Sequence, residues 1–127
     1  MIPLTIRFGD EEFVDGVNLD AAQFYEKMAA SDVMPSTAAP APGAFEAAFR
    51  EAAASGDPVV CINLSSALSA TMQSAENGAR AVRDDLDVRV VDSRSITAGL
   101  GMQVLAAARA AADGASADEV VAIVEDL

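Results

Sequence analysis

Four hydroxyl side chains gather within seven residues, directly after the apolar run Val59–Leu64. They are Ser65, Ser66, Ser69 and Thr71. An apolar run that stops at hydroxyls and continues into a helical pattern indicates a strand-to-helix junction, where the first N–H groups of the helix lack an internal partner. Capping the helix requires only one or two hydroxyls. The excess predicts a site for an anion or a polar head group.

A second polar junction follows the apolar run Val88–Val91. Asp92, Ser93, Arg94 and Ser95 stand there, again at the carboxyl end of a predicted strand. Ligands of parallel sheets bind outside this edge, so both junctions are predicted to face the same ligand. Arg94 has two interpretations, neutralising a bound anion or forming a salt bridge with one of the twenty acidic residues.

The residue types present exclude several kinds of chemistry. Histidine is absent and cysteine occurs once, at Cys61, which removes Ser-His-Asp catalysis, Cys-His catalysis and histidine-based metal sites. Hydroxyls without a neighbouring base do not make a nucleophile. The spacing of the acidic residues does not favour a metal either. The sequence therefore predicts no catalytic residue, no metal and no cofactor, and an enzyme acting on a phosphorylated small molecule is a weak alternative.

The segment Gly99-Leu100-Gly101 resembles part of a dinucleotide-binding fingerprint. The third glycine of that fingerprint would stand at position 104, which is valine, and the segment lies inside a predicted helix. We therefore interpret these glycines as small residues that allow close packing between helix and sheet.

Net charge and cysteine content indicate the class of partner and the compartment. With 8 Lys and Arg against 20 Asp and Glu, the net charge of −12 excludes nucleic acid and an anionic membrane surface as partners. No apolar run approaches the ~20 residues needed to span a bilayer, and no secretory signal is recognisable. A single cysteine cannot form an internal disulfide. These observations favour a cytoplasmic protein without integral membrane association.

Periodicity predicts the regular elements. A hairpin is expected from Met1–Phe8 and Glu12–Asp15, and Asp20 with Gln23 forms a capping box for a helix that ends near Ala30. The remaining elements are expected in this order: a helix over Gly43–Ser55, a strand over Val59–Leu64, a helix to Arg83, a strand over Val88–Val91, a helix over Ile96–Asp113 and a helix over Ala117–Leu127.

Three expectations concern the faces and loops of these elements. The long helix is expected to turn Leu100, Val104, Leu105 and Ala108 inward. The last helix is expected to leave Val120, Val121, Val124 and Leu127 with little to cover them. Three prolines predict an irregular loop over Ser31–Pro42, in which Ser36 and Thr37 form a candidate binding pair.

The order of elements predicts an α/β fold. We expect one domain over residues 1–127, with a mainly parallel sheet, helices on both faces and a short β-hairpin at the start. The unalternating apolar run Val59–Leu64 is typical of a strand covered on both faces.

Four segments, in this order, resemble the DegV family of bacterial fatty-acid-binding proteins. They are IPLTIRFGDEEFVDGV at 2–17, PSTAAP at 35–40, NLSSALSATMQSA at 63–75 and VRVVDSRSITAGLG at 88–101. The resemblance covers nearly the whole chain, and four segments in register make it specific.

The resemblance implies a function and a set of residues. DegV proteins hold a long-chain fatty acid between two α/β domains, with the carboxylate on hydroxyl groups and the acyl chain in an apolar tunnel, and some present the acid to a fatty acid kinase. Thr37 matches the threonine of the family's proline–threonine–serine–glutamine–proline loop, and Ser69 matches the serine of its leucine–serine–glycine–threonine motif. These two are the implied carboxylate ligands; the residues that could assist them are Ser36, Ser65, Ser66, Thr71, Ser93 and Arg94.

The chain departs from the family pattern at three positions and at both ends. Ala38 and Ala39 replace a serine and a glutamine, and Ala70 replaces the motif's glycine. Relative to the family, the first strand and the C-terminal domain are missing, which predicts a partial N-terminal domain. The alternative to lipid binding is therefore an interaction or structural module that dimerises through its exposed apolar surface and binds no lipid alone.

Overall fold

The computed structural model describes residues 1–127, which pack as two compact units, Met1–Pro40 and Ala41–Leu127. That the whole chain acts as one domain stays a prediction. The elements are β1 (Thr5–Phe8), β2 (Glu11–Val14), α1 (Ala21–Ala30), β3 (Ser36–Ala38), α2 (Pro42–Ala52), β4 (Val59–Asn63), α3 (Thr71–Val82), β5 (Val88–Asp92), α4 (Thr97–Ala112) and α5 (Ala117–Asp126).

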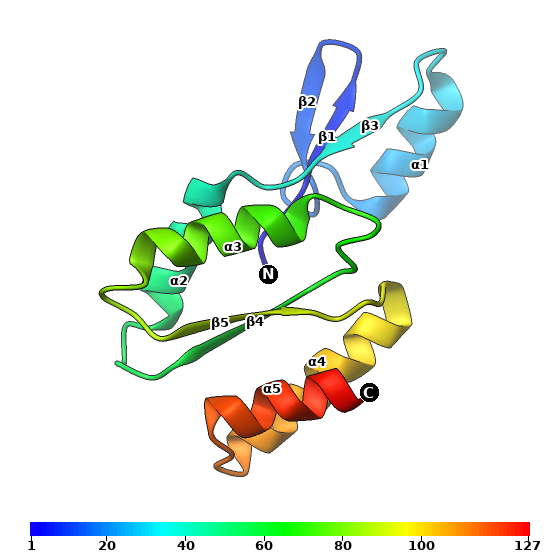
Figure 1. The fold of residues 1–127 in the computed structure, drawn as a ribbon. Coiled ribbons are helices and arrows are strands. Elements are labelled where there is room, and N and C mark those ends of the chain that lie inside the picture. The colour runs from blue at the N-terminus through cyan, green and yellow to red at the C-terminus, as the bar shows by residue number, and fades with distance from the viewer. The chain divides into compact units, whose positions relative to one another are not determined.

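The first unit is a three-stranded antiparallel sheet with one helix, drawn in blue and cyan in Figure 1. Its strand order is β2-β1-β3, and the predicted hairpin is confirmed. The Asp20 capping box is also present: the Asp20 carboxylate accepts from Gln23 N–H and the Gln23 side chain accepts from Asp20 N–H. These local features follow from turn and capping chemistry.

A small apolar core holds this unit together. Ile6, Phe8 and Leu19 are buried, and Phe13 and Phe24 pack against them. Lys27, the only lysine of the chain, pairs with Glu11 at 2.6 Å while its ammonium group lies 5.4 and 5.2 Å from the ring centres of Phe8 and Phe13. The lysine thus ties α1 to the hairpin by an ion pair and cation–π contacts.

The prediction that residues 31–42 have no regular structure is wrong for Ser36–Ala38. These three residues pair antiparallel with β1, with Ile6 opposite Thr37. Pro35 and Pro40 flank the paired residues, so their missing N–H groups remove no bond from the ladder. An edge strand of three residues between prolines is compatible with proline's usual restriction to sheet edges.

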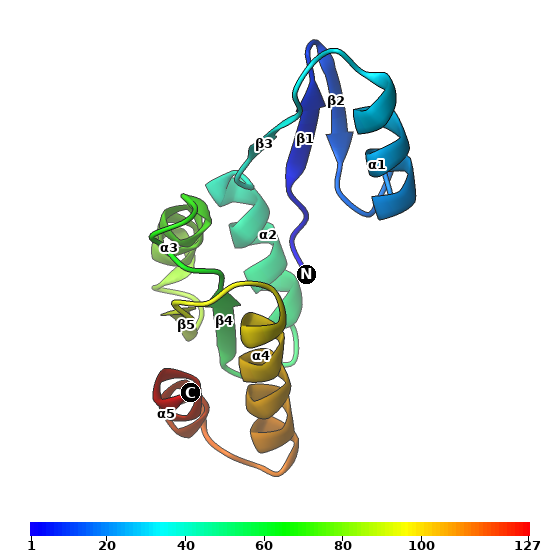
Figure 2. The same cartoon turned by 90° about the vertical axis from the view of Figure 1, so that its right-hand side faces the viewer.

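The second unit is built on a parallel pair of strands. β4 and β5 pair in register, with Cys61 opposite Val90 and Asn63 opposite Asp92. Figures 1 and 2 show α3 on one side of this pair and α5 on the other, while α2 packs on α3 and α4 packs on α5. The α/β class and the helices on both faces are confirmed.

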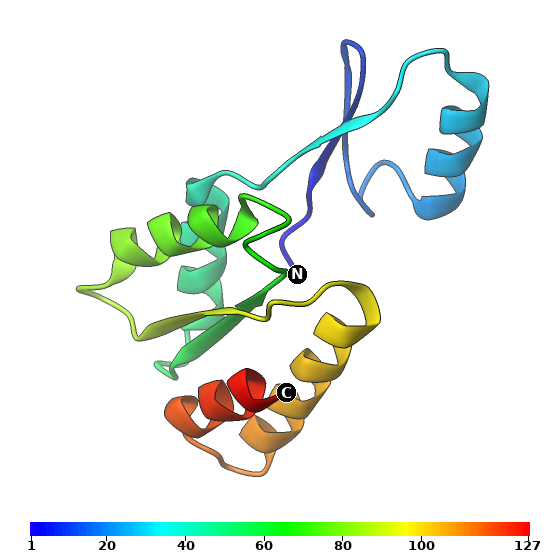
Figure 3. The ribbon, with the colours of Figure 1, turned by 45° about the vertical axis from the view of Figure 1, so that its right-hand side comes forward.

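The inward face of α4 differs from the prediction. Gln103 and Ala107 are its buried residues, whereas Leu105 is 56% exposed and Val104 is 41% exposed. The reason is that α4 packs mainly against α5 and not against the strands, which Figure 3 shows. Leu100 is only half-buried and Ala108 is exposed.

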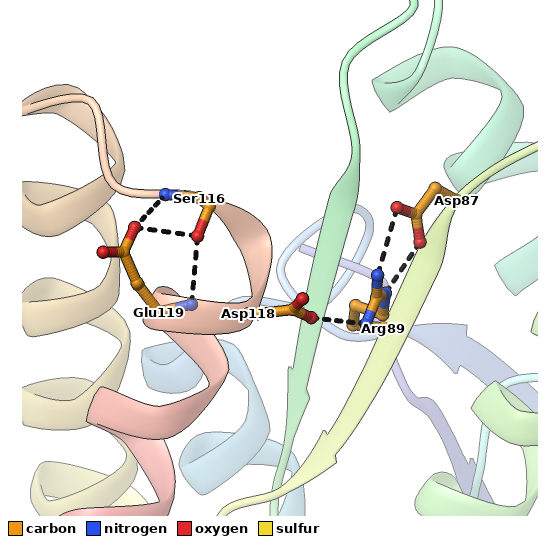
Figure 4. Close-up of polar contacts among 5 residues, drawn as sticks. All are labelled: Asp87, Arg89, Ser116, Asp118 and Glu119. Atoms are coloured by element: carbon orange, nitrogen blue, oxygen red, sulfur yellow. Dashed lines mark hydrogen bonds and ion pairs between the residues drawn. The ribbon is translucent and has the colours of Figure 1, made fainter.

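The last helix is better covered than the sequence predicted. Val120 and Val124 are buried in one core cluster with Val91 and Ala107, and Val121 packs against that cluster; Leu127 alone of the four is exposed. Figure 4 shows the polar contacts that hold α5: Ser116 and Glu119 form the predicted capping box, and Arg89 bridges Asp87 at 2.7 Å and Asp118 at 2.6 Å. These contacts fix the helix against β5.

Glycine permits a close helix crossing at one position, Gly78 in α3. A Cβ there would lie 2.7 Å from Phe45 Cβ and 2.8 Å from the Pro42 carbonyl oxygen, both in α2. Gly101, which we interpreted as a close-packing residue, has no atom within 4 Å of a built Cβ. The interpretation was therefore wrong for Gly101, and the close crossing lies between α2 and α3.

Gly78→Ala is expected to lower the free energy of unfolding by about 1–2 kcal/mol, because overpacking costs ~1–3 kcal/mol and the better helix propensity of alanine returns at most ~1 kcal/mol. Gly101→Ala is the matched control, and it should be neutral or stabilising by up to ~1 kcal/mol. Urea unfolding followed by circular dichroism measures both changes. Equal stabilities for the two variants would contradict the close crossing.

Candidate functional site

The two polar junctions meet at the carboxyl edge of the parallel pair. The loop of residues 64–70 joins β4 to α3, and the loop of residues 93–96 joins β5 to α4. Ser65 N–H donates to the Ser95 carbonyl oxygen at 2.9 Å, and Ser93 N–H donates to the Asn63 carbonyl oxygen at 3.1 Å. The predicted convergence of the junctions is therefore present in the structure.

Asp92 links these loops through its carboxylate. Oδ2 accepts the Ser66 hydroxyl proton at 2.6 Å, while Oδ1 accepts from Ser66 N–H at 3.2 Å and from Arg94 N–H at 2.9 Å. These bonds, chiefly the one from the Ser66 hydroxyl, hold the pKa of Asp92 below its usual value. The carboxylate is thus ionised and fully engaged with the two loops.

Ser69 and Thr71 form a hydroxyl pair at the start of α3. Their oxygen atoms lie 2.9 Å apart, and Ser69 Oγ also accepts from Thr71 N–H at 3.2 Å. Each of the two hydroxyls carries one proton, and the hydrogen bond between them engages one of the two, so the other proton stays available. Thr71 is buried and Ser69 is half-buried. When Thr71 donates to Ser69, the free proton lies on Ser69, where a ligand can reach it.

Three other hydroxyls of this edge, those of Ser65, Ser66 and Ser93, are engaged in holding the loops. Ser66 gives its proton to Asp92, and Ser93 Oγ donates to the Ser95 carbonyl oxygen at 3.3 Å. Ser65 is buried and its hydroxyl oxygen accepts from Ala67 N–H. Of the predicted assisting residues in this unit, these three serve the loop structure first.

Arg94 is exposed and its guanidinium has neither an ion pair nor a hydrogen bond, although its backbone N–H is bound by Asp92. Of the two interpretations of this cation, the internal salt bridge is therefore wrong. Arg94 also has a positive φ of 51°, which is uncommon for a residue other than glycine. Arg94 therefore presents a free charged donor at this edge, beside the one proton that the Ser69–Thr71 pair retains.

Two hollows border the edge. One of about 600 Å³ is lined by Ser66, Ser69, Ala70, Met72, Gln73, Glu76 and Asp92. The other, of about 670 Å³, is lined by Arg94 and Arg109 and by apolar side chains, among them Met102, Leu105 and Leu127. Asp92 borders both hollows. Their volumes fall in the range of small-molecule sites.

Met72 lines the first hollow, and the buried Asn63 lies behind it. Asn63 is buried, and its amide nitrogen lies 3.5 Å from Cys61 Sγ and 3.7 Å from Met72 Sδ. Burial raises the pKa of the Cys61 thiol. The thiol is therefore protonated at neutral pH and packs as an apolar group.

Thr37 and Ser36, the remaining predicted site residues, lie in the first unit on β3. Both are exposed. The structure thus brings together the six predicted residues of the second unit, Ser65, Ser66, Ser69, Thr71, Ser93 and Arg94, and presents the other two on the surface of the first.

The model of the DegV family matches residues 1–127, the whole chain. The chain belongs to the DegV family. A DegV domain-containing protein of Caldanaerobacter subterraneus is 40% identical over 124 residues, which are 98% of this chain and 44% of that protein. The chain therefore spans less than half the length of such DegV relatives.

Solved DegV structures share the fold. DegV of Bacillus subtilis, described as a fatty acid binding protein, aligns with a TM-score of 0.92 and 32% identity over 99% of this chain and 45% of that one. The fatty acid kinase (Fak) B3 protein of Streptococcus pneumoniae, loaded with linoleic acid, aligns with a TM-score of 0.86 and 28% identity over 98% and 44%.

The alanine that replaces the DegV glycine at position 70 is conformationally suited to its place. Ala70 has φ −72° and ψ 0°, which alanine adopts without strain. The substitution therefore needs no left-handed backbone. The missing serine and glutamine at Ala38 and Ala39 lie on or directly after β3.

Two polar residues have roles at this edge that the sequence did not predict. One is Asp92, which was placed at the second junction but whose bond to Ser66, 26 residues away, was not predicted. The other is Gln103, which is buried and donates from its amide nitrogen to the carbonyl oxygens of Ser93 and Val124, leaving its own Oε1 without a partner. Gln103 thereby ties the β5–α4 loop to α5. A polar residue at a buried position of α4 was the available signal, but it points inward only because α4 packs on α5.

Two further findings concern metals and membranes. No three metal-ligating side chains of the His, Cys, Asp and Glu types cluster around one point. None of the helices combines the length and apolar character that crossing a bilayer requires.

Proposed function

We propose that this chain binds a long-chain fatty acid without catalysing a reaction, with Ser69 donating its free hydroxyl proton to the carboxylate. The observation that carries the proposal is the Ser69–Thr71 pair, because its second proton is left for a ligand at the mouth of a hollow. The fatty acids bound by DegV relatives give this donor a carboxylate as its natural partner. Thr37 is the second proposed carboxylate ligand, from its match to the family's threonine.

Charge also shapes the proposal. Asp92 and Glu76 border the hollow beside Ser69, and both repel an anion. Arg94 is proposed to offset this repulsion, since its guanidinium is free and lines the neighbouring hollow. The acyl chain is proposed to lie in that second hollow, against Met102 and Leu105.

The proposed role extends to presentation of the acid to a fatty acid kinase. A neighbour named as a fatty acid kinase B3 protein supports this step. Work beside a kinase would place the protein in the cytoplasm, where ATP is available.

Ser69→Ala is expected to weaken palmitate binding about tenfold or more, because it removes the hydroxyl that is proposed to donate to the carboxylate. Ser55→Ala is the matched control and should change the affinity less than about threefold, since the Ser55 hydroxyl donates to Asp57 before the opposite end of β4. Thr37→Ala should weaken binding as Ser69→Ala does. Calorimetric titration of the delipidated chain with palmitate measures all three.

Mass spectrometry of the purified protein under denaturing conditions is the companion experiment. A co-purified fatty acid and a rise in melting temperature on adding palmitate support the proposal. Absence of both would refute lipid binding by this chain.

A second candidate function is an interaction module that dimerises. The exposure of Met102 at 69%, Leu105 at 56% and Leu127 at 70% favours it, because monomers rarely leave large apolar patches uncovered. The burial of Val120 and Val124 reduces the surface that such a dimer would cover.

Leu105→Gln separates the two functions. If the hollow holds an acyl chain, the variant should bind palmitate at least tenfold more weakly and remain monomeric; Val104→Gln, on the same helix but outside the hollow, should bind within about twofold of the wild type. If the chain is a dimerising module, sedimentation velocity should show a wild-type dimer without lipid that Leu105→Gln dissociates. A wild-type monomer at micromolar concentration would exclude the second function.

A further inference from the structure

Asp92 occupies the one place where the two polar loops and the two hollows of the second unit meet. It accepts from Ser66, 26 residues earlier in the chain, and from Arg94, two residues later. It also borders the hollow beside Ser69 and the hollow beside Arg94. Among the polar residues of the unit, Asp92 alone combines these positions.

The bonds to Asp92 decide which groups remain for a ligand. Because Ser66 gives its proton to Oδ2, its hydroxyl cannot donate to a carboxylate. Because Arg94 N–H is held by Oδ1 in a positive-φ turn, the backbone at Arg94 is fixed while its guanidinium stays free. Ser69 N–H and Leu68 N–H donate to the Ser65 carbonyl oxygen, so the loop that Asp92 holds at Ser66 is the loop that carries Ser69.

We propose that Asp92 is the positioning residue of this edge: its carboxylate holds the β4–α3 loop at Ser66 and the β5–α4 loop at Arg94, and so sets Ser69 and Arg94 toward one ligand. The inference rests on the proposed function for its ligand, but the positioning itself is a property of the two loops. Asp92 touches no ligand in this role. It acts through the groups that it holds.

The charge of Asp92 is part of this role. The bonds from Ser66 and Arg94 hold the pKa of Asp92 below its ordinary value. Asp92 therefore holds the loops at every pH above its ordinary pKa, and it releases them only as the pH falls through the lowered pKa. The other charged side chains that line the two hollows bordered by Asp92 are Arg94 on its own loop, Glu76 on α3, Arg109 on α4 and Glu125 on α5. Arg94 favours the ionised form of Asp92.

Asp92→Asn tests the proposal by two independent measurements. Asparagine removes the charge and the acceptor for the Ser66 hydroxyl. Amide hydrogen exchange followed by NMR should show at least a tenfold loss of protection at Ser66 and Arg94, with the β4 and β5 amides unchanged. Palmitate binding should weaken about tenfold.

Asp87→Asn is the matched control. Asp87 stands just before the opposite end of β5, and its pKa is likewise lowered, by Arg89. This variant should keep the protection at Ser66 and Arg94 and the affinity for palmitate. Equal losses in both variants would show a general effect of charge and would overturn the proposal.

The two measurements keep the proposals apart. If the wild-type chain binds no palmitate, the proposed function fails and the exchange result alone decides whether Asp92 holds the loops. Unchanged protection in Asp92→Asn overturns the positioning role, whatever the lipid result. Lost protection with unchanged palmitate affinity overturns the link between the loops and the ligand.

Ser66→Ala provides a second route if Asp92→Asn does not fold. It removes the hydroxyl that donates to Asp92 and leaves the carboxylate in place. Titration of the ¹³C carboxyl signal should then show the pKa of Asp92 rising toward its ordinary value. An unchanged pKa would overturn the bond on which the proposal rests.

Discussion

The register of two parallel strands determines where the site lies. β4 and β5 run side by side for five residues each and end level, with Asn63 opposite Asp92. Both strands therefore end at the same edge of the sheet, and the loops that follow them are hydrogen-bonded through Ser65, Ser93 and Ser95. A shift of one residue would turn Asp92 to the other face of the sheet and away from Ser66.

The number of hydroxyl groups at this edge overstates how many of them can bind a ligand. Most of these groups satisfy the loops' own polar atoms, as buried polar groups must. Ser66 is committed to Asp92, and Ser93 to the Ser95 carbonyl. The Ser69–Thr71 pair retains one proton and Arg94 keeps a free guanidinium, and each depends on neighbours that fix its position.

The parts of the fold that could be predicted are those encoded locally. Capping boxes at Asp20 and Ser116, and the apolar runs of β4 and β5, depend on residues a few positions apart. β3 was missed because its pairing with β1 depends on residues 31 positions away, as between Ile6 and Thr37. The inward face of α4 was mistaken because its partner is α5, and no pattern within α4 identifies the partner.

The same distinction holds for the site. The clustering of Ser65, Ser66, Ser69 and Thr71 was visible in the sequence, and so was their approach to the second junction. The sequence did not show which of these hydroxyls hold the loops and which can bind a ligand. That distinction depends on bonds such as the one from Ser66 to Asp92, between residues that only the folded chain brings together. The proposed ligand class comes from the DegV relatives, and the geometry shows that the Ser69–Thr71 pair retains one proton beyond the bond between its members.

Met72, which lines the hollow beside Ser69, makes one side of this hollow easy to deform. Asn63 directs its amide nitrogen to two sulfur atoms, those of Cys61 and Met72, which are weak acceptors. Displacing the Met72 thioether therefore breaks no strong bond, and an unbranched methionine can change its shape at little cost. The hollow beside Ser69 thus has one rigid side, built on Asp92 and the loops, and one compliant side that can adjust to occupants of different girth.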